Sequence, residues 1–299
     1  MEKGLDIIKQ DVRRELDEMQ LNTLLLSYKI IYNSFPSLTK QQLVDKLYQW
    51  FPYKRILKHR DYSMTFTPSQ TISFEYYQGA GYAKVNLYLR YKKLTESWMG
   101  NSDNKITILP STFSKKGFKT LLNKTKRKQL SSLKQNLKKT IQQNKYDFKK
   151  IKTAISDILH VIYHAPKLKE TFYAYRGENN FNLNFGIEKN LNSMQLDGET
   201  YKTNQLNLQT NNTFLFKGFN SFSIAPWVSL GFSGQCCLYR IKITDSIPYF
   251  IFSHSDRYKE YEILLPPAMF KVVKVHDIES PLSKFIRMRM YDIEFVKAI

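Results

Sequence analysis

The hydrophobic pattern of this 299-residue chain changes its period near residue 170, and this change constrains the fold more than any other feature. Before it, apolar residues recur at helical spacing over residues 5–33, 39–50 and 147–164. After it, short apolar and aromatic runs predict strands at residues 172–177, 213–219, 236–244, 248–253, 261–265, 269–275 and 285–296. Helices followed by many short strands are typical of an α+β domain.

The first part of the chain carries a second strand-like region. Residues 62–67, 71–77 and 82–91 contain alternating apolar and polar residues, and Gly79–Gly81 predicts a turn between the last two runs. We therefore expect residues 1–110 to form a smaller α+β module of unknown role. Residues 111–299 are then a second domain, and the boundary lies in the loop-like stretch near residues 105–112.

The positive charge of the chain is concentrated in its middle. The formal net charge is +20, and residues 113–170 hold 16 lysines and arginines against three acidic residues. Such a segment is either a solvated helix face or a surface that binds nucleic-acid phosphates. Aromatic residues are sparse within residues 115–152, which disfavours base stacking. A nucleic-acid partner bound through residues 115–152 therefore stays an open interpretation.

The sequence gives no sign of a membrane span or a metal site. No apolar run approaches the roughly 18 residues that a membrane-spanning helix needs, and the N-terminus lacks the layout of a signal peptide. We expect a soluble protein. His160 and His164 are spaced like a metal-binding pair on a helix, but no third ligand accompanies them, so we expect no metal.

Two motifs carry side chains suited to phosphate binding and to the positioning of a carboxylate. Arg176 ends the predicted strand Phe172–Gly177, where a planar guanidinium can hold phosphate oxygens bidentately. Further along, Ser221 and Ser223 share one face of a strand. A serine hydroxyl there can donate a hydrogen bond to a carboxylate and fix its orientation.

A pair of glutamates begins the apolar strand at residues 261–265. Side chains alternate along a strand, so Glu260 and Glu262 are expected to point the same way and Tyr261 the opposite way. Neighbouring carboxylates raise each other's pKa. Pairs of this kind are enriched at functional sites.

The three motifs, in this order, resemble the arginine-serine-glutamate class of mono-ADP-ribosyltransferases. The likeness is to exotoxin-type enzymes, namely clostridial binary toxin components, vegetative insecticidal toxins and bacteriophage enzymes, and it covers roughly residues 115–299. It implies two packed, antiparallel-rich sheets flanked by N-terminal helices. It also implies NAD as the substrate, nicotinamide as a product, and a target protein that carries an acceptor arginine.

The resemblance assigns a role to each motif residue. Glu262 becomes the catalytic carboxylate, which stabilises positive charge on the ribose, and Ser221 holds it in place. Arg176 grips the NAD pyrophosphate, and Phe232 lies near nicotinamide. Gly177 and Ser223 complete the NAD-binding set. Target recognition falls to Tyr258 and Glu260, and a glutamate two residues before the catalytic one implies arginine as the acceptor.

The sequence departs from the family pattern at two positions. Phe222 stands where many relatives have threonine, and Gln235 stands where several toxins have a phosphate-binding arginine. Arg240 and Lys217 are the candidates to replace that cation.

Two other functions stay open at this point. In the first alternative the chain is a basic nucleic-acid-binding protein. In the second it is an interaction module on a catalytically silent transferase fold. If it is a transferase, we expect it to act in the cytoplasm of a target cell; delivery by a phage or virus, delivery by a dedicated export machine and ordinary secretion all stay open as routes.

Overall fold

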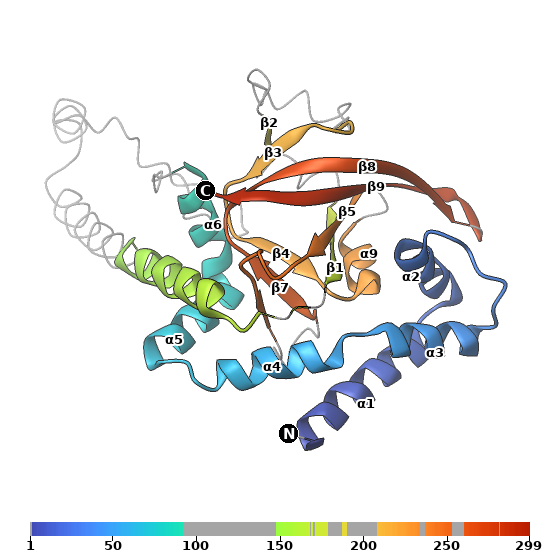
Figure 1. The fold of residues 1–299 in the computed structure, drawn as a ribbon, viewed down its shortest axis with the longest axis horizontal. Coiled ribbons are helices and arrows are strands. Elements are labelled where there is room, and N and C mark those ends of the chain that lie inside the picture. The colour runs from blue at the N-terminus through green and yellow to red at the C-terminus, as the bar shows by residue number, and fades with distance from the viewer. Residues whose placement is uncertain are drawn as a thin grey trace, which may run out of the picture. The chain divides into compact units, whose positions relative to one another are not determined.

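The computed structural model describes most of the chain (Figure 1). The described residues are 2–91, 148–167, 169, 171–178, 187–189, 208–233, 237–252, 260–280 and 282–299. They divide into two compact units. One consists of Met1–Phe66 with His160–Ile299, and the other of Thr67–Leu159.

Four helices begin the first unit: α1 (Glu2–Glu18), α2 (Leu21–Tyr32), α3 (Lys40–Trp50) and α4 (Tyr53–Ser63). The single helix expected over residues 5–33 is therefore two helices, and α2 ends at Asn33, whose left-handed φ of 58° terminates it. The helix expected at residues 39–50 is confirmed as α3. Thr39 and Gln42 form a capping box at its N-terminus.

The strands expected at residues 62–67, 71–77 and 82–91 are wrong. These residues lie in the end of α4, in α5 (Pro68–Tyr76), in a π-helical turn η1 (Tyr77–Gly81) and in α6 (Tyr82–Tyr91). Thr67 caps α5 and Pro68 begins it, a strong helix-start signal. Val85 and Leu89 are both buried on α6 because residues four apart share a helix face. The expected turn is a kink at Gly79 (φ −95°, ψ −135°).

The α+β class is confirmed, although the described residues of the expected N-terminal module, 2–91, hold helices and no strand. The helix predicted at residues 147–164 is present over 148–164. The domain boundary near residue 110 lies outside the described residues and stays a prediction.

Nine strands form one hydrogen-bonded order, β2-β3-β8-β9-β5-β1-β4-β7-β6. The pairs are antiparallel except for β5 with β9, so the expected antiparallel-rich sheets join into a single order. The strands are β1 (Phe172–Glu178), β2 (Ile187–Lys189), β3 (Thr213–Phe216), β4 (Asn220–Ser223), β5 (Cys237–Ile243), β6 (Phe250–Ile251), β7 (Glu262–Leu265), β8 (Ala268–Ser280) and β9 (Ser283–Ala298).

A short helix, α9 (Pro226–Phe232), follows β4 and packs on β1. The sequence pattern did not predict it. Beside it lies α2, while α1, α3 and α4 run below β1, β4 and β7 in the view of Figure 1.

The N-terminal helices and the sheet share one hydrophobic core. Val12 and Leu16 of α1, and Leu47 of α3, belong to the same buried cluster as Phe222 and Ile263 of the sheet. Burial of such side chains contributes about 1.5–3 kcal/mol each. Residues 1–66 therefore help to build the sheet domain in which the motif residues lie.

Candidate functional site

Arg176 lies on β1, an interior strand between β5 and β4, and its Cα pairs with that of Tyr239 on β5. Its Nη1 donates to the carbonyl oxygen of Ser221 at 3.0 Å, and its Cζ lies 5.1 Å from the ring centroid of Phe216. The side chain is half-buried. A guanidinium has five N–H donors, a geometry that suits the binding of anionic groups.

Gly177 lies against the C-terminal part of α9. A Cβ added to Gly177 would lie 1.8 Å from the carbonyl oxygen of Ser229 and 2.5 Å from the amide nitrogen of Ser233. The hydroxyl of Ser229 also donates to the carbonyl of Tyr175 at 2.9 Å. Glycine is therefore required at this position because helix backbone occupies the place of a side chain.

The two serines of β4 contact different parts of the segment Glu260–Glu262, called the glutamate segment below. The Ser221 hydroxyl hydrogen-bonds the Glu262 side chain. The Ser223 hydroxyl donates to the carbonyl oxygen of Glu260 at 2.6 Å and accepts from the amide of Ala225 at 3.0 Å. The expected link between a serine and Glu262 is present, and Ser223 provides a second link through the backbone.

Glu262 is the first residue of β7 and pairs with Ser223 across the strands. Its carbonyl accepts from the amide of Phe252 at 2.8 Å. Burial raises the pKa of Glu262 to about 7, and the charge of Glu260 raises it too, while the Ser221 hydrogen bond and Arg176 act in the opposite direction. Arg176, Ser221, Glu260 and Glu262 are thus close enough to influence one another.

The backbone between the two glutamates is not a regular strand. Tyr261 has a left-handed φ of 46°, and β7 begins only at Glu262. The strand alternation that predicted a common face for Glu260 and Glu262 therefore does not hold, although the two carboxylates interact. Glu260 is half-buried, and burial raises its pKa.

Comparison with known families decides what this arrangement belongs to. The sequence profile described as ADP-ribosyltransferase exoenzyme matches residues 39–153 and 122–289, which is most of the chain. The chain belongs to the ADP-ribosyltransferase exoenzyme family. Arg176, Ser221, Glu260 and Glu262 therefore sit in a matched exoenzyme domain, as the sequence resemblance predicted. No curated protein sequence gives a significant match.

Among solved structures, one with a TM-score of 0.50 agrees at the level of the fold, and two with lower scores are similar to the chain. The enzymatic component C2-I of the C2 toxin from Clostridium botulinum, at pH 3.0, has a TM-score of 0.50 at 16% identity, over 82% of this chain and 47% of that one. BECa, an ADP-ribosylating toxin of a binary enterotoxin of C. perfringens, gives 0.47 at 15% identity, over 85% and 48%. Plx2a, an ADP-ribosyltransferase toxin from Paenibacillus larvae, gives 0.47 at 14%, over 85% and 96%. This chain spans about half the length of the C2-I chain.

The remaining residues that the sequence predicted for the site have different surroundings. Phe232 ends α9 with 55% of its surface exposed, free to meet a ligand. Tyr258 and Gln235 lie outside the described residues. Arg240 is not a substitute phosphate ligand, because it is buried, forks onto Asp292 at 2.6 and 2.8 Å and donates to the carbonyl of Ile30 at 2.6 Å. Lys217, between β3 and β4, is half-buried.

Glu15 and Trp227, two residues that hold the glutamate segment, were not predicted from the sequence. The hydroxyl of Tyr261 donates to Glu15 on α1 at 2.9 Å, and Trp227 on α9 donates to the other oxygen of Glu15 at 3.1 Å. Nothing in the amphipathic pattern of α1 distinguishes Glu15 from its charged neighbours, so no sequence signal could have found it.

The two histidines contact each other. The rings of His160 and His164 stack 4.1 Å apart, and His164 Nδ1 lies 2.7 Å from the carbonyl oxygen of His160. Across the described parts of the chain, no group of three ligand-type side chains could hold a metal ion. Within the same residues, no helix has the length and apolar character to cross a membrane.

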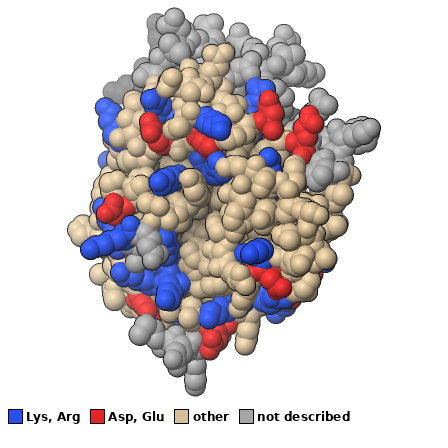
Figure 2. Space-filling model, turned by 45° about the vertical axis from the view of Figure 1, so that its right-hand side comes forward, with Lys and Arg blue, Asp and Glu red and all other residues tan. Residues whose placement is uncertain are grey.

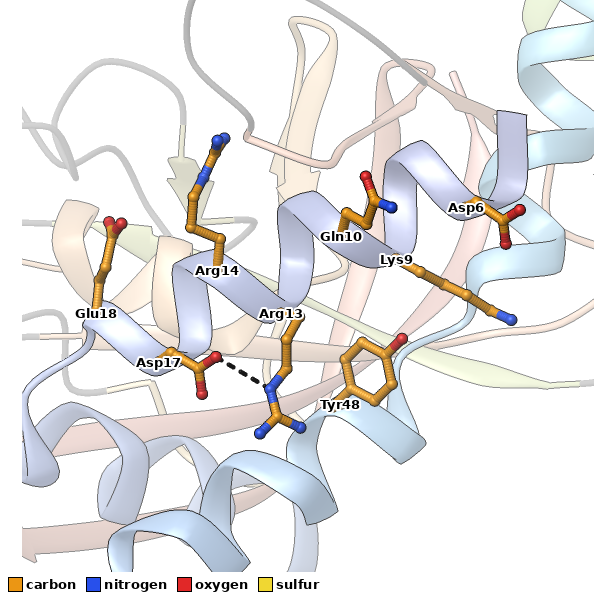
Figure 3. Close-up of a pocket in the computed structure, with 8 residues that line it drawn as sticks. All are labelled: Asp6, Lys9, Gln10, Arg13, Arg14, Asp17, Glu18 and Tyr48. Atoms are coloured by element: carbon orange, nitrogen blue, oxygen red, sulfur yellow. Dashed lines mark hydrogen bonds and ion pairs between the residues drawn. The ribbon is translucent and has the colours of Figure 1, made fainter. Parts of the chain in front are cut away.

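An open groove of about 620 Å³ lies on the first unit, along α1 and next to α3, and Figure 3 shows its lining. The side chains that line it are Asp6, Lys9, Gln10, Arg13, Arg14, Asp17, Glu18 and Tyr48. Arg13 binds Asp17 at 3.1 Å and Asp45 at 2.7 Å, so its charge is already neutralised. The groove includes none of the motif residues and we assign it no ligand.

Proposed function

We propose that this chain is an NAD-dependent mono-ADP-ribosyltransferase that moves ADP-ribose from NAD to an arginine of a target protein and releases nicotinamide. One observation carries the proposal. In a chain of the exoenzyme family, a single carboxylate, Glu262, is hydrogen-bonded by Ser221 and lies within the influence of Arg176 and Glu260.

Arg176 is the residue that we assign to the NAD pyrophosphate. Its contacts with the Ser221 carbonyl and the Phe216 ring fix the guanidinium, and guanidinium geometry suits bidentate binding of phosphate oxygens. Gly177 lets α9 pack directly on β1 beside it. Phe232, exposed at the end of α9, is the residue that we assign to the nicotinamide side.

Glu262 is the residue that we assign to bond cleavage. When the bond between nicotinamide and the ribose C1′ breaks, the electron pair leaves with nicotinamide and positive charge develops on the ribose, as in glycoside hydrolysis. An ionised Glu262 stabilises that charge. Ser221 keeps the carboxylate oriented and, by hydrogen bonding, favours its ionised form.

Glu260 is the residue that we assign to the acceptor. A guanidinium nitrogen of the target arginine forms the new bond to C1′, and the guanidinium must lose a proton to do so. Glu260 is half-buried, and burial raises its pKa, which makes its carboxylate a better proton acceptor than an exposed glutamate. Arginine is therefore the proposed acceptor, with Tyr258 as an additional contact to the target.

The test is transfer of label from adenylate-labelled NAD to a cell lysate and to agmatine, a small guanidinium acceptor. Wild type should label protein bands and agmatine. Glu262→Gln should abolish both transfer and nicotinamide release, whereas Glu260→Gln should abolish transfer and retain NAD hydrolysis. Glu18→Gln, an exposed carboxylate on α1, is the control. If wild type releases no nicotinamide with the lysate and none with agmatine, the proposal is refuted.

The alternative of a nucleic-acid-binding or silent interaction protein has no support from the family match. On the face drawn in Figure 2, basic and acidic side chains lie interspersed. Most of the basic segment 115–152 lies outside the described residues, so a nucleic-acid partner stays a prediction. A salt titration of RNA and DNA binding by the full chain tests it. We further propose that the enzyme acts in the cytoplasm of a target cell.

A further inference from the structure

Glu15 joins two side chains that flank the glutamate segment. Its Oε2 accepts a hydrogen bond of 2.9 Å from the Tyr261 hydroxyl, and its Oε1 accepts one of 3.1 Å from the Trp227 indole nitrogen. Both oxygens of one carboxylate are therefore used to hold residues more than 200 positions away in the sequence. Hydrogen bonds to an ionised acceptor are stronger than those between neutral groups.

Tyr261 has an uncommon backbone conformation that needs support. A left-handed φ of 46° is strained for an aromatic residue. Its carbonyl accepts from the amide of Ile224 at 3.1 Å, and its ring meets that of Phe51, the residue after α3, edge-on with centroids 4.9 Å apart. The hydrogen bond to Glu15 fixes the far end of the same side chain, so the ring cannot swing without losing it.

Two sets of hydrogen bonds connect residues 223–227 with residues 260–261. Ser223 links residues 223–225 to Glu260 through its hydroxyl. Glu15 links Trp227, at the start of α9, to Tyr261. Trp227 also packs on Phe51, with ring centroids 5.6 Å apart. The Ser223 bridge acts on the backbone before Tyr261, and the Glu15 bridge acts on its side chain.

We infer that Glu15 is a positioning residue, which sets the placement of Glu260 and Glu262 by holding Tyr261 and Trp227. Tyr261 is joined by a peptide bond to each glutamate, so a change in its φ or ψ redirects both carboxylates. The inference rests on the proposed function. It gives the N-terminal helix α1 a part in the reaction although α1 carries no residue of the three motifs.

The inference is tested with Glu15→Ala, Glu15→Gln and Tyr261→Phe. Glu18→Ala, one turn further along α1 and exposed, is the matched control. For each variant the thermal midpoint, the Kd for NAD and the kcat and KM of NAD hydrolysis are measured well below the midpoint. We expect Glu15→Ala to lower kcat at least tenfold with the Kd for NAD within twofold of wild type. Glu15→Gln should lose less, since its amide oxygen can still accept from one of the two donors.

A double-variant comparison separates positioning from general stability. In a Tyr261→Phe, Trp227→Phe background these two donors are gone, so adding Glu15→Ala should reduce kcat much less than it does in wild type. A lower thermal midpoint with wild-type kcat in the folded protein would overturn the inference. A loss confined to NAD affinity would also overturn it.

A crystal structure of Glu15→Ala, which removes both acceptor oxygens, provides a readout that does not need activity. The inference expects Tyr261 to leave its left-handed conformation or the Glu262 carboxylate to move relative to Ser221. Unchanged placement of both would overturn the inference even if wild type is active. Wild type that neither hydrolyses NAD nor transfers ADP-ribose would instead refute the proposed function, and the structure would still report on the positioning.

Discussion

The hydroxyl of Ser223 donates a 2.6 Å hydrogen bond to the carbonyl oxygen of Glu260, 37 residues further along the chain, and accepts one from the amide of Ala225. Ser221, two residues earlier on β4, contacts the side chain of Glu262. The two serines of a single motif therefore do different things. Ser223 fixes the backbone of the glutamate segment, and Ser221 orients one carboxylate.

Ser223→Ala should lower the stability of the fold. Ser223 is buried, and its removal leaves the Glu260 carbonyl and the Ala225 amide without this partner. Buried groups that lose a hydrogen bond cost about 1–3 kcal/mol each in free energy of unfolding. Urea denaturation should show a loss of at least about 1 kcal/mol. Wild-type stability in Ser223→Ala would show that the bridge does not contribute.

Ser221→Ala should act on the pH dependence of the reaction. The Ser221 hydrogen bond lowers the pKa of Glu262, so its loss raises that pKa further above the ordinary value. If the ionised carboxylate is the active form, kcat/KM for NAD hydrolysis falls as the pH falls through about 7 in wild type. In Ser221→Ala this acid limb should move to higher pH. An acid limb at the wild-type position would argue against the contact.

Gly177→Ala should be among the most damaging small substitutions in the chain. The added methyl would meet the Ser229 carbonyl at 1.8 Å, and this atom belongs to the backbone of α9 and cannot move alone. Overpacking of this kind costs about 1–3 kcal/mol or more. Gly231→Ala, in the same helix, is the control, because nothing lies within 4 Å of its added Cβ. Thermal melts should show destabilisation in the first variant only.

Local patterns in the sequence predicted much of the sheet and the motif contacts. Apolar and aromatic runs at residues 172–177 and 261–265 predicted β1 and β7, and the family resemblance predicted that Ser221 would meet Glu262. The strand predictions hold because these strands are short and largely buried, and short continuous apolar runs are typical of buried strands.

Long-range packing could not be predicted in the same way. Val85 and Leu89 fit a strand pattern and a helix pattern equally well, because residues four apart share one face of either element. The helix start at Thr67 and Pro68 belongs to the earlier helix α5 and gives no signal for α6. The left-handed backbone conformation at Tyr261 could not be predicted, because the residue is neither glycine nor asparagine. Its partner Glu15 lies 246 residues away, and a single sequence does not reveal such a contact.

Glu262→Gln should stabilise the fold at neutral and alkaline pH. The pKa of Glu262 is about 7 in the folded chain and near 4.5 when unfolded, so the folded state binds more protons between these values. The contribution of the Glu262 carboxyl to the free energy of unfolding is therefore fully present below about pH 4.5 and is lost as the pH rises to about 7. Each pKa unit corresponds to about 1.4 kcal/mol, and since the side chain is only partly buried we expect a gain of about 1–2 kcal/mol at pH 8.

The measurement for Glu262→Gln is the free energy of unfolding at pH 4 and pH 8. The gain over wild type should vanish at pH 4, where both states carry a protonated Glu262. Glu18→Gln controls for the loss of a surface charge. An equal gain at both pH values would mean that burial of the charge is not its cause.

His59 should make the fold sensitive to acid, with the opposite sign. It is buried on α4, its Nδ1 accepts from the amide of Ile251 on β6 at 3.2 Å, and its ring stacks on Tyr249. Burial lowers its pKa from 6.5 to about 3. A protonated Nδ1 cannot accept that hydrogen bond, so between these values the unfolded chain binds the extra proton. The contribution of His59 is present above about pH 6.5 and is lost as the pH falls towards 3.

This dependence has a limiting slope of about 1.4 kcal/mol per pH unit. His59→Gln keeps an acceptor but has no titrating group, so its stability relative to wild type should improve steadily as the pH is lowered from 6.5 to 4. His160→Gln, which removes an exposed histidine, should leave the wild-type slope nearly intact. Parallel stability curves for wild type and His59→Gln would show that His59 is not held neutral by the fold. In that case the contact between α4 and β6 would not be the acid-sensitive element of the domain.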